Sequence, residues 1–156
     1  MHYFIFPEKD TTIFEASSSL NSGLDEVLEI RKNVSDTGAS VDVSRILIKF
    51  DTTFFQEASS SGLIHQTGSR AAKYYLNLYD ANPKALAASQ SLYAYAISGS
   101  WDMGTGRSYD NPQTSDGCSW KYRYSETNGT LWASGSGAED GAGGVWYSSS
   151  VAPAAS

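Results

Sequence analysis

Hydrophobic and polar residues alternate along three stretches of the chain, residues 44–51, 73–80 and 91–101. In the first stretch, Ile46 and Ile48 take every second position. A period of two places alternate side chains on opposite faces of a strand, one face buried and the other in solvent. The pattern therefore predicts strands of an antiparallel sheet. We expect an all-β fold, an antiparallel β-sandwich or jelly-roll-like domain with long Gly/Ser-rich loops toward the C-terminus.

Weaker patterns predict the remaining elements. Residues 3–6 and 11–15 are typical of two short strands on either side of Pro7. Residues 25–32 fit a short helix with acidic residues at its start, and they also fit a strand. We favour the strand, because the stretch is short and lies between other strand signals. One helical turn is expected around residues 54–58, and the Ser- and Gly-rich stretches between these elements are expected to be loops.

Length and composition predict one globular domain. The chain has 156 residues, of which 40% are hydrophobic and 13% aromatic, and a chain of this size can bury a substantial core. We expect the β-sandwich to occupy residues 1–132. Residues 133–156 are expected to form a Gly-, Ser- and Ala-rich loop and tail that leads into a longer chain if this sequence is a fragment.

Charge and cysteine content argue against several classes of partner and site. A net charge of −6 disfavours nucleic acid as a partner, because a nucleic-acid binder needs a basic patch. It also disfavours an anionic membrane surface, and the absence of an 18-residue apolar run predicts no membrane span. The N-terminus lacks the pattern of a signal peptide, so we expect synthesis in a cytoplasm without conventional secretion. Cys118 is the only cysteine, which predicts no disulfide framework and no thiolate metal site.

Residues that could carry out catalysis form no recognised pattern. His2 and His65 lack the spacing of a metal site, and a serine nucleophile would have no evident general base. The acidic residues form two groups in the sequence, which could act as a glycosidase pair or cap turns. These groups are Asp25, Glu26 and Glu29, and Asp102, Asp110 and Asp116. We favour turn capping and expect no enzymatic activity and no cofactor, with calcium bound by the second group as the alternative.

Three charged residues, Arg45, Lys49 and Asp51, share one face of the first predicted strand. One interpretation is a solvent-exposed sheet face on which these residues form ion pairs of small energy. The other is an electrostatic contact with a neighbouring subunit. The two interpretations remain open, and Arg45 and Lys49 are candidate contact residues under the second.

Four sequence elements, in this order, resemble the DNRLRE-type β-sandwich domain. They are TTIFEASSSLNSGLDEVLEIRK, SRILIKFD, KYYLNLYD and SLYAYAISGSWDMGTGRSYDNPQTSDGCSWKYR. The resemblance covers roughly residues 11–123, and its specificity lies in the order and spacing of the elements. The family positions fall on Asn21, Gly23, Arg45, Lys49, Phe50, Asp51, Leu76, Leu78, Tyr79, Trp101, Gly104, Thr105, Asn111, Pro112 and Trp120.

This resemblance implies a jelly-roll-like sandwich with no known catalytic centre, found as a carbohydrate-binding or adhesive module. The start MHYFIFPEKDTTIFE is similar to the variant carried by virion structural proteins of marine tailed bacteriophages. The family closes with a further hydrophobic strand, for which no pattern follows Trp146. We expect the chain to be the N-terminal part of a longer protein, and a partner that supplies the missing strand is compatible with this expectation.

Aromatic residues are concentrated in the second half of the chain. Their positions in the family favour Trp101 and Trp120 as core residues. Trp132, Trp146 and Tyr147 lie among Gly and Ser residues, a setting better suited to contact with a partner than to a core. We therefore take these three residues as candidate contacts.

With no catalytic pattern in the sequence, the resemblance implies a non-enzymatic structural protein of a tailed-phage virion. Such a protein would decorate the capsid, belong to the neck or tail, or anchor a fibre. Its expected partners are other virion proteins and copies of itself, and the particle would be assembled in the cytoplasm of a bacterial host. The alternative is a carbohydrate-binding or adhesive module that recognises cell-surface glycans, in which exposed aromatic rings stack on sugars.

Overall fold

A computed structural model of the chain describes residues 3–34, 40–79, 81, 92, 94, 95, 97 and 99–132. The chain divides into two compact units. Unit 1 comprises Met1–Glu8 and Lys49–Ser91, and unit 2 comprises Lys9–Ile48 and Leu92–Ser156. The expected tail, residues 133–156, lies outside the described residues.

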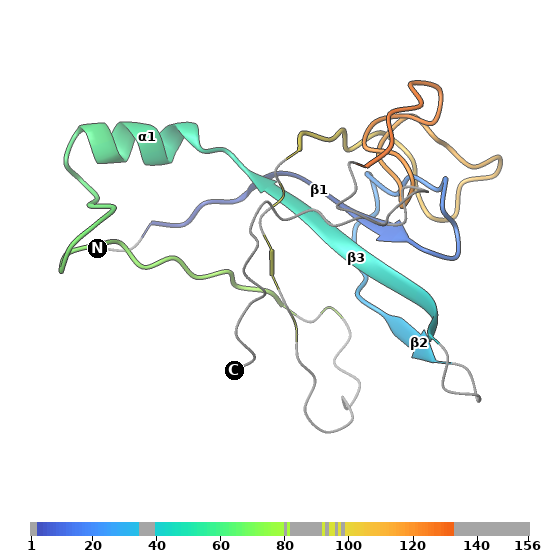
Figure 1. Cartoon of the computed structure of the whole chain (residues 1–156), viewed down its shortest axis with the longest axis horizontal. Helices are drawn as coiled ribbons and strands as arrows, with labels where there is room; N and C mark the ends of the chain where they lie inside the picture. The colour runs from blue at the N-terminus through green and yellow to red at the C-terminus, as the bar shows by residue number, and fades with distance from the viewer. Residues whose placement is uncertain are drawn as a thin grey trace. The chain divides into compact units, whose positions relative to one another are not determined.

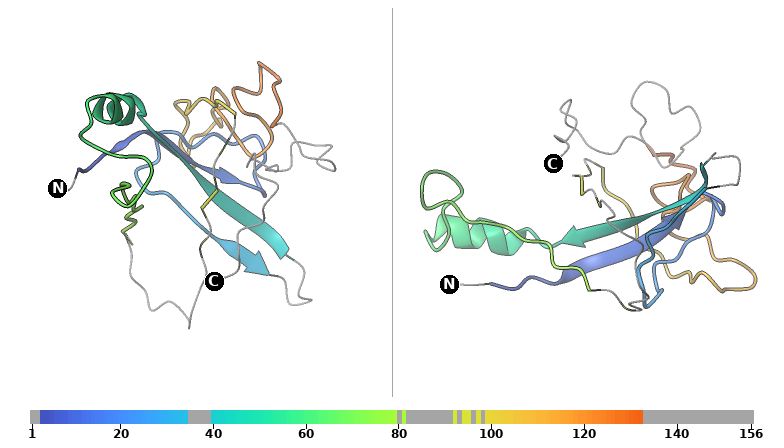
Figure 2. Two further views of the ribbon diagram at one scale, coloured as in Figure 1. Left: turned by 60° about the vertical axis from the view of Figure 1, so that its left-hand side comes forward. Right: turned by 90° about the horizontal axis from the view of Figure 1, so that it is seen from below.

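The central element is a three-stranded sheet with the strand order β1-β3-β2 (Figure 1). β1 spans Pro7–Phe14, β2 spans Lys32–Val34 and β3 spans Ser40–Phe50. β2 pairs antiparallel with β3, with Lys32 opposite Val43. β1 runs beside β3 in the opposite direction, as Figures 1 and 2 show. The chain is therefore mostly β in its regular structure, with antiparallel strands, as the alternating pattern predicts.

Two of the predicted strands are confirmed. The strand predicted for residues 44–51 is β3, which begins four residues earlier, at Ser40. The strand predicted for residues 11–15 is part of β1. β1 starts at Pro7 instead of following it, because the first position of a strand tolerates a residue without an N–H group. Residues 3–6 form no strand.

The strand favoured for residues 25–32 is wrong, since strand pairing begins only at Lys32. Side chains of the sheet hold this segment instead. The Glu29 N–H donates to Thr12 Oγ1 at 2.9 Å, and the Arg31 N–H donates to Ser44 Oγ at 2.8 Å. Hydroxyl groups of β1 and β3 thus satisfy backbone groups that a strand would satisfy through a ladder.

The strands predicted for residues 73–80 and 91–101 are also wrong for the residues that the structure describes. Residues 73–79 contain no strand, and neither do the described residues between 92 and 101. Alternation of hydrophobic and polar residues indicates that a segment is suited to one face of a sheet. It does not supply the neighbouring strand whose N–H and C=O groups complete the ladder.

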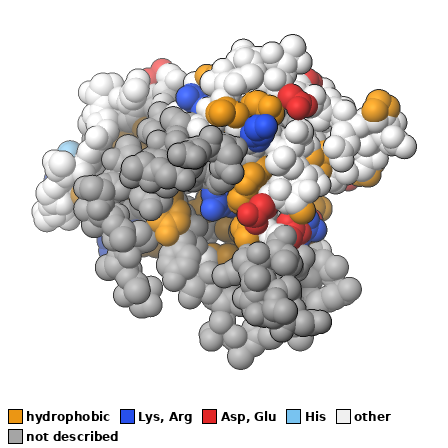
Figure 3. All heavy atoms as spheres, turned by 45° about the vertical axis from the view of Figure 1, so that its right-hand side comes forward, with side chains coloured by type: hydrophobic (Ala, Val, Ile, Leu, Met, Phe, Trp, Pro, Cys, Tyr) orange, Lys and Arg blue, Asp and Glu red, His pale blue; other side chains and the backbone are white. Residues whose placement is uncertain are grey.

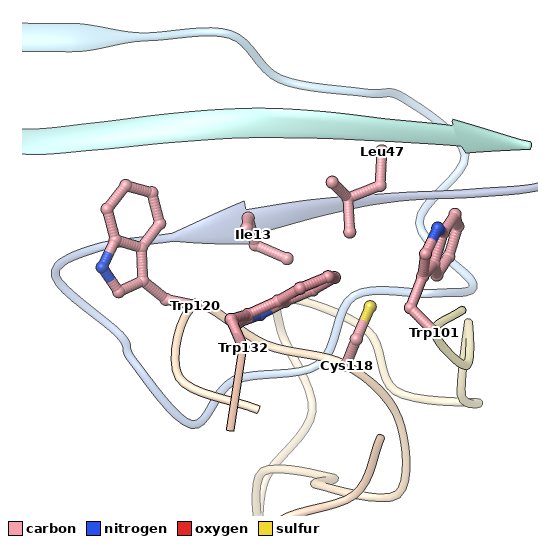
Figure 4. Close-up of a cluster of buried hydrophobic side chains, with 6 residues drawn as sticks. All are labelled: Ile13, Leu47, Trp101, Cys118, Trp120 and Trp132. Atoms are coloured by element: carbon pink, nitrogen blue, oxygen red, sulfur yellow. The ribbon is translucent and has the colours of Figure 1, made fainter. Parts of the chain in front are cut away.

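The core of unit 2 lies between the sheet and the loops that follow residue 99. Figure 4 shows its side chains converging from β1, β3 and these loops. Its buried members are Ile13, Leu47, Trp101, Cys118, Trp120 and Trp132. The core positions predicted for Trp101 and Trp120 are therefore confirmed.

The face of β3 that carries Arg45, Leu47 and Lys49 is the face that meets this core. Leu47 is buried, whereas Ile46 and Ile48 on the opposite face are only half-buried. The interpretation of this face as a solvent-exposed outer face is therefore wrong. The tryptophan-bearing loops cover it at Leu47, and Arg45 and Lys49 remain exposed on either side of the covered position.

α1 spans Thr53–Ser60 and confirms the helical turn expected around residues 54–58. The Thr53 N–H donates to Asp51 Oδ1 at 2.8 Å, which satisfies one free N–H group at the start of the helix. This hydrogen bond lowers the pKa of the Asp51 carboxyl. Among the described residues, no helix has the length and apolar character needed to cross a membrane.

Candidate functional site

Asn21 joins three segments of unit 2 through its buried side chain, whose exposed fraction is 0%. Its Nδ2 donates to the carbonyl oxygens of Met103 at 2.7 Å and Cys118 at 2.9 Å. Its Oδ1 accepts a hydrogen bond from the Gly106 N–H at 2.8 Å. Both donors and the acceptor of the amide are thus paired, which is the condition under which a buried polar group stabilises one arrangement of its surroundings.

Glycines surround this side chain because the backbone approaches it closely. A Cβ atom at Gly117 would lie 2.5 Å from both Asn21 Nδ2 and Gly104 Cα, and one at Gly23 would lie 2.1 Å from the Met103 oxygen. Gly104 also has a φ of +75°, a conformation that side chains disfavour. We call this group the Asn21 junction, with the members Asn21, Gly23, Gly104, Gly106 and Gly117.

Several residues that carry the family resemblance meet in or beside the Asn21 junction. Asn21, Gly23 and Gly104 belong to it, and the buried Trp101 precedes it in the chain. Thr105 binds the carboxylate of a neighbouring loop. Each of these residues has a structural role in the described part of the chain, through hydrogen bonding, close backbone approach or core packing.

Two of the loop carboxylates cap turns, as predicted. Asp116 accepts hydrogen bonds from the N–H and Oγ1 of Thr105, at 2.9 and 2.6 Å. Asp110 Oδ2 accepts from the Arg107 N–H at 2.8 Å and from Thr114 Oγ1 at 3.0 Å. Within the described residues, no three His, Cys, Asp or Glu side chains gather as a metal site would require.

The carboxylate of Asp116 makes the free energy of unfolding depend on pH in the acid range. Burial alone raises the pKa of Asp116, but the hydrogen bonds from Thr105 outweigh it, and the pKa falls below its ordinary value of 3.8. A lowered folded-state pKa contributes stability that is present above pH 3.8 and lost as the pH falls through the folded value. We therefore expect Asp116→Asn to be less stable than the wild type at neutral pH, with the difference shrinking below pH 3.8.

Urea unfolding across this pH range measures the difference. Asp102→Asn is the matched control, because it removes the same charge from an exposed side chain that receives no hydrogen bond among the described residues. A constant difference between wild type and Asp116→Asn at every pH would contradict the assigned role of the Thr105 hydrogen bonds.

The first acidic group is also engaged by neighbouring loops. Asp25 Oδ1 accepts a hydrogen bond from the Ser108 N–H at 3.0 Å. Glu29 forms an ion pair with Arg31 at 3.3 Å, and Glu26 is exposed. Asp25 thus contacts another loop, and Glu26 and Glu29 lie at the surface, which agrees with the predicted surface and turn roles.

The two remaining candidates for chemistry are Cys118 and His65. Burial raises the pKa of the Cys118 thiol to about 12. The group is therefore protonated at neutral pH and is a poor nucleophile. His65 is exposed, and its carbonyl oxygen accepts a hydrogen bond from the Ala72 N–H at 2.7 Å.

Cationic side chains lie over aromatic rings of unit 2. The Lys9 amine lies 4.6 Å from the ring centre of Trp101, and it also donates to the Trp101 carbonyl oxygen. The Arg45 guanidinium lies 4.7 Å from the ring centre of Trp120. Desolvation by these surroundings lowers the pKa of Arg45, while the nearby Glu15 opposes the shift. The stacking gives Arg45 a structural role that the sequence does not reveal.

Replacing Arg45 by glutamine is expected to lower the free energy of unfolding by about 0.5–2 kcal/mol, because it removes the guanidinium that covers Trp120. Thermal and urea unfolding measure the change. Arg70→Gln is the control, since Arg70 is exposed and its replacement should change stability by less than about 0.5 kcal/mol. Equal effects of the two substitutions would exclude a stabilising Arg45–Trp120 contact.

One of the two tryptophans proposed as contact residues, Trp132, lies in the core. Trp132 is 4% exposed, and its Nε1 donates to the Ser119 carbonyl oxygen at 2.8 Å. In this conformation its ring presents almost no surface to a partner. Trp146 and Tyr147 lie outside the described residues.

Lys49, the second charged candidate, forms an exposed ion pair within unit 1. Its Nζ lies 3.0 Å from Glu8 Oε2. Although the face is covered at Leu47, Lys49 is itself exposed and forms the kind of exposed ion pair that was expected, with Glu8 as its partner. Such exposed pairs contribute little to stability. The role of Arg45 or Lys49 in contact with another subunit stays a prediction.

Unit 1 exposes a group of hydrophobic side chains, and within residues 73–79 they come from both faces of the strand that the alternating pattern predicts. Tyr75 and Tyr79 are 78% and 91% exposed. Other exposed members in this unit are Phe4, Phe6, Leu63, Tyr74, Leu76 and Leu78. On the described part of the face in Figure 3, hydrophobic side chains reach the surface beside Lys, Arg, Asp and Glu side chains. We call residues 73–79 the exposed segment; it is the best-supported candidate contact region.

A row of aromatic rings links the exposed segment to α1. The ring centres of Phe55 and Tyr74 are 5.6 Å apart, and those of Phe54 and Phe55 are 6.1 Å apart. Tyr3 packs against Phe54 at 5.4 Å. These contacts anchor the beginning of the exposed segment and leave the rest of its side chains in solvent.

No protein-family model, curated protein or solved structure matches this chain.

Proposed function

We propose that this chain is a non-enzymatic structural protein of a tailed-bacteriophage virion, which acts through contacts with neighbouring subunits. The exposed hydrophobic side chains of unit 1 carry this proposal. Large hydrophobic groups gathered on a surface are typical of an interaction site, because burying them against a partner is favourable. Tyr75 and Tyr79 are the most suitable anchors, since aromatic rings supply much of the binding energy at interfaces.

A second line of support comes from the residues that carry the family resemblance. Asn21, Gly104 and Trp120 lie in the interior of unit 2. These motif positions therefore stabilise the fold. We extend the proposal to the architecture. The sheet β1-β3-β2 would be one layer of an antiparallel sandwich, because one face of it already carries the tryptophan core.

Quantitative mass spectrometry of purified phage particles tests this function. The expected result is the chain, or the longer protein that contains it, in many copies per particle, as repeated symmetric assembly requires. Absence of the protein from particles that carry all other structural proteins would overturn the proposal.

A glycan-binding module is the second candidate, and Tyr109 is the observation that favours it. Its ring is 69% exposed, and Arg107 Nη1 donates to its hydroxyl at 2.6 Å. A fixed, exposed ring is suited to stacking on a sugar face. Retention of the protein on a polysaccharide column that Tyr109→Ala abolishes, with absence from particles, would favour this candidate.

A further inference from the structure

The exposed segment, residues 73–79, is open to solvent along both its side chains and its backbone. It forms neither helix nor strand, and every side chain in it is exposed. Among the described residues, no backbone hydrogen bond joins it to another part of the chain. In Figure 1 the stretch runs as an elongated trace after α1. A molecule that binds an extended chain can therefore reach its N–H groups, C=O groups and side chains at the same time.

The start of the exposed segment is held in place, whereas the residues after Tyr74 are not. The Ala72 N–H donates to the His65 carbonyl oxygen at 2.7 Å, and the Tyr74 ring packs against Phe55. Tyr75 is the first residue beyond these contacts, and its side chain is 78% exposed. The peptide bond that follows Tyr75 thus lies within an accessible stretch that is tethered at one end.

We infer that the exposed segment is a site of proteolytic processing, at which an endoprotease with a preference for aromatic residues cleaves the bond between Tyr75 and Leu76. A substrate chain is bound as an extended strand, through its backbone groups and through a pocket for the side chain before the cleaved bond. Exposed stretches are also the preferred sites of nicking. In the reaction the C–N bond breaks, and water supplies a hydroxyl group to the Tyr75 carbonyl carbon and a proton to the Leu76 nitrogen.

The two products are expected to stay associated, because both contribute to unit 2. Cleavage divides the chain into residues 1–75 and 76–156. The three strands come from the first product, and the buried tryptophans come from the second. Asn21 of the first product also bonds to the Met103 carbonyl oxygen and the Gly106 N–H of the second. These contacts do not involve the cleaved bond, so the nicked chain keeps the core of unit 2.

This inference goes beyond the proposed function and does not depend on it, because it concerns the free chain. Burial of the exposed segment against a neighbouring subunit would close it to a protease, so processing takes place before association. The experiment therefore uses the purified full chain without phage particles. Its failure would leave the virion function in place.

Limited digestion with chymotrypsin, whose pocket accepts aromatic side chains, tests the inference. Tyr109 is an internal comparison, because its side chain is also exposed but its loop is closed by a hydrogen bond from the Asp110 N–H to the Arg107 carbonyl oxygen at 3.1 Å. Mass spectrometry gives the initial cleavage rate after each tyrosine, and each rate is divided by that of a synthetic peptide with the same sequence. The corrected rate after Tyr75 should be about tenfold or more above that after Tyr109.

Two variants test the assigned bond, and the nicked wild type tests the association of the products. Tyr75→Phe keeps an aromatic ring and should be cleaved within about twofold of the wild-type rate, whereas Tyr75→Asp should slow cleavage at this bond about tenfold or more. Tryptophan fluorescence, to which the core tryptophans contribute, shows whether each variant is folded. On a size-exclusion column the nicked wild type should elute with the intact chain and separate into two fragments only in denaturant.

Three results would overturn the inference. The first is an equal corrected rate of cleavage after Tyr75 and after Tyr109. The second is a folded Tyr75→Asp variant that is cleaved at this bond as fast as the wild type. The third is a nicked chain whose two fragments separate without denaturant.

Discussion

Replacing Asn21 by alanine is expected to lower the free energy of unfolding by about 3–5 kcal/mol. The substitution leaves the carbonyl oxygens of Met103 and Cys118 and the N–H of Gly106 without their partners. Each buried group that loses its hydrogen bond costs about 1–3 kcal/mol. Urea unfolding followed by tryptophan fluorescence measures the loss.

A second variant separates the hydrogen bonds from the volume of the side chain. Asn21→Asp keeps the size but replaces both N–H donors with an oxygen that faces two carbonyl oxygens, and a comparable loss is expected. Asn77→Ala is the matched control, because Asn77 is exposed and makes no described hydrogen bond. If Asn21→Asp were as stable as the wild type at neutral pH, the junction would not depend on the amide.

Replacing Gly104 by alanine is expected to cost about 2–5 kcal/mol, from two causes that add. The φ of +75° disfavours any side chain, at about 1–2 kcal/mol. A Cβ atom would also lie 2.5 Å from Asn21 Oδ1 and 2.6 Å from Gly117 Cα. Overpacking of this kind costs about 1–3 kcal/mol more, because backbone must move to relieve it.

Gly129→Ala measures the first cause alone. Gly129 has a φ of +70°, but a Cβ atom there would meet no other atom within 4 Å. Its replacement should cost only the conformational part, about 1–2 kcal/mol. Thermal unfolding of the two variants side by side gives the difference. Equal losses would show that the backbone is not closely packed around the Asn21 junction.

Local sequence patterns were sufficient to predict one strand and the helix. The alternation around Ile46 and Ile48 predicts β3, and the apolar positions around Phe54 and Phe55 predict α1. The face of β3 could not be predicted in the same way. Leu47 stands between two charged residues in alternate positions, and its burial depends on loops more than 50 residues further along the chain.

The Asn21 junction could not be derived from the residues around Asn21. The segment is rich in Ser, Asn and Gly, a composition that predicts an ordinary turn. What distinguishes Asn21 from a turn asparagine is its pairing with carbonyl groups 82 and 97 positions away. Only the resemblance singled it out, together with Gly104 and Trp101. Asn21 and Trp101 are buried, and the resemblance itself stays a prediction.

The exposed segment shows the opposite case, in which a strong pattern finds no partner within the described chain. A sequence pattern records that a segment suits a sheet, and it does not record which chain supplies the neighbouring strand. The tyrosines and leucines of residues 73–79 are the same residues in either arrangement.

Hydrogen–deuterium exchange, resolved by residue and repeated over a range of protein concentrations, tests most directly the claim of a fixed core with an unpaired strand-forming segment. The amides of Gly106 and Cys118, which donate to Asn21 Oδ1 and to the Asp102 oxygen, should be protected at every concentration. The amides of residues 73–79 should exchange rapidly, because no backbone hydrogen bond within the described residues protects them. Protection of residues 73–79 in the monomer would contradict the account, because it would place the segment in a sheet of its own chain.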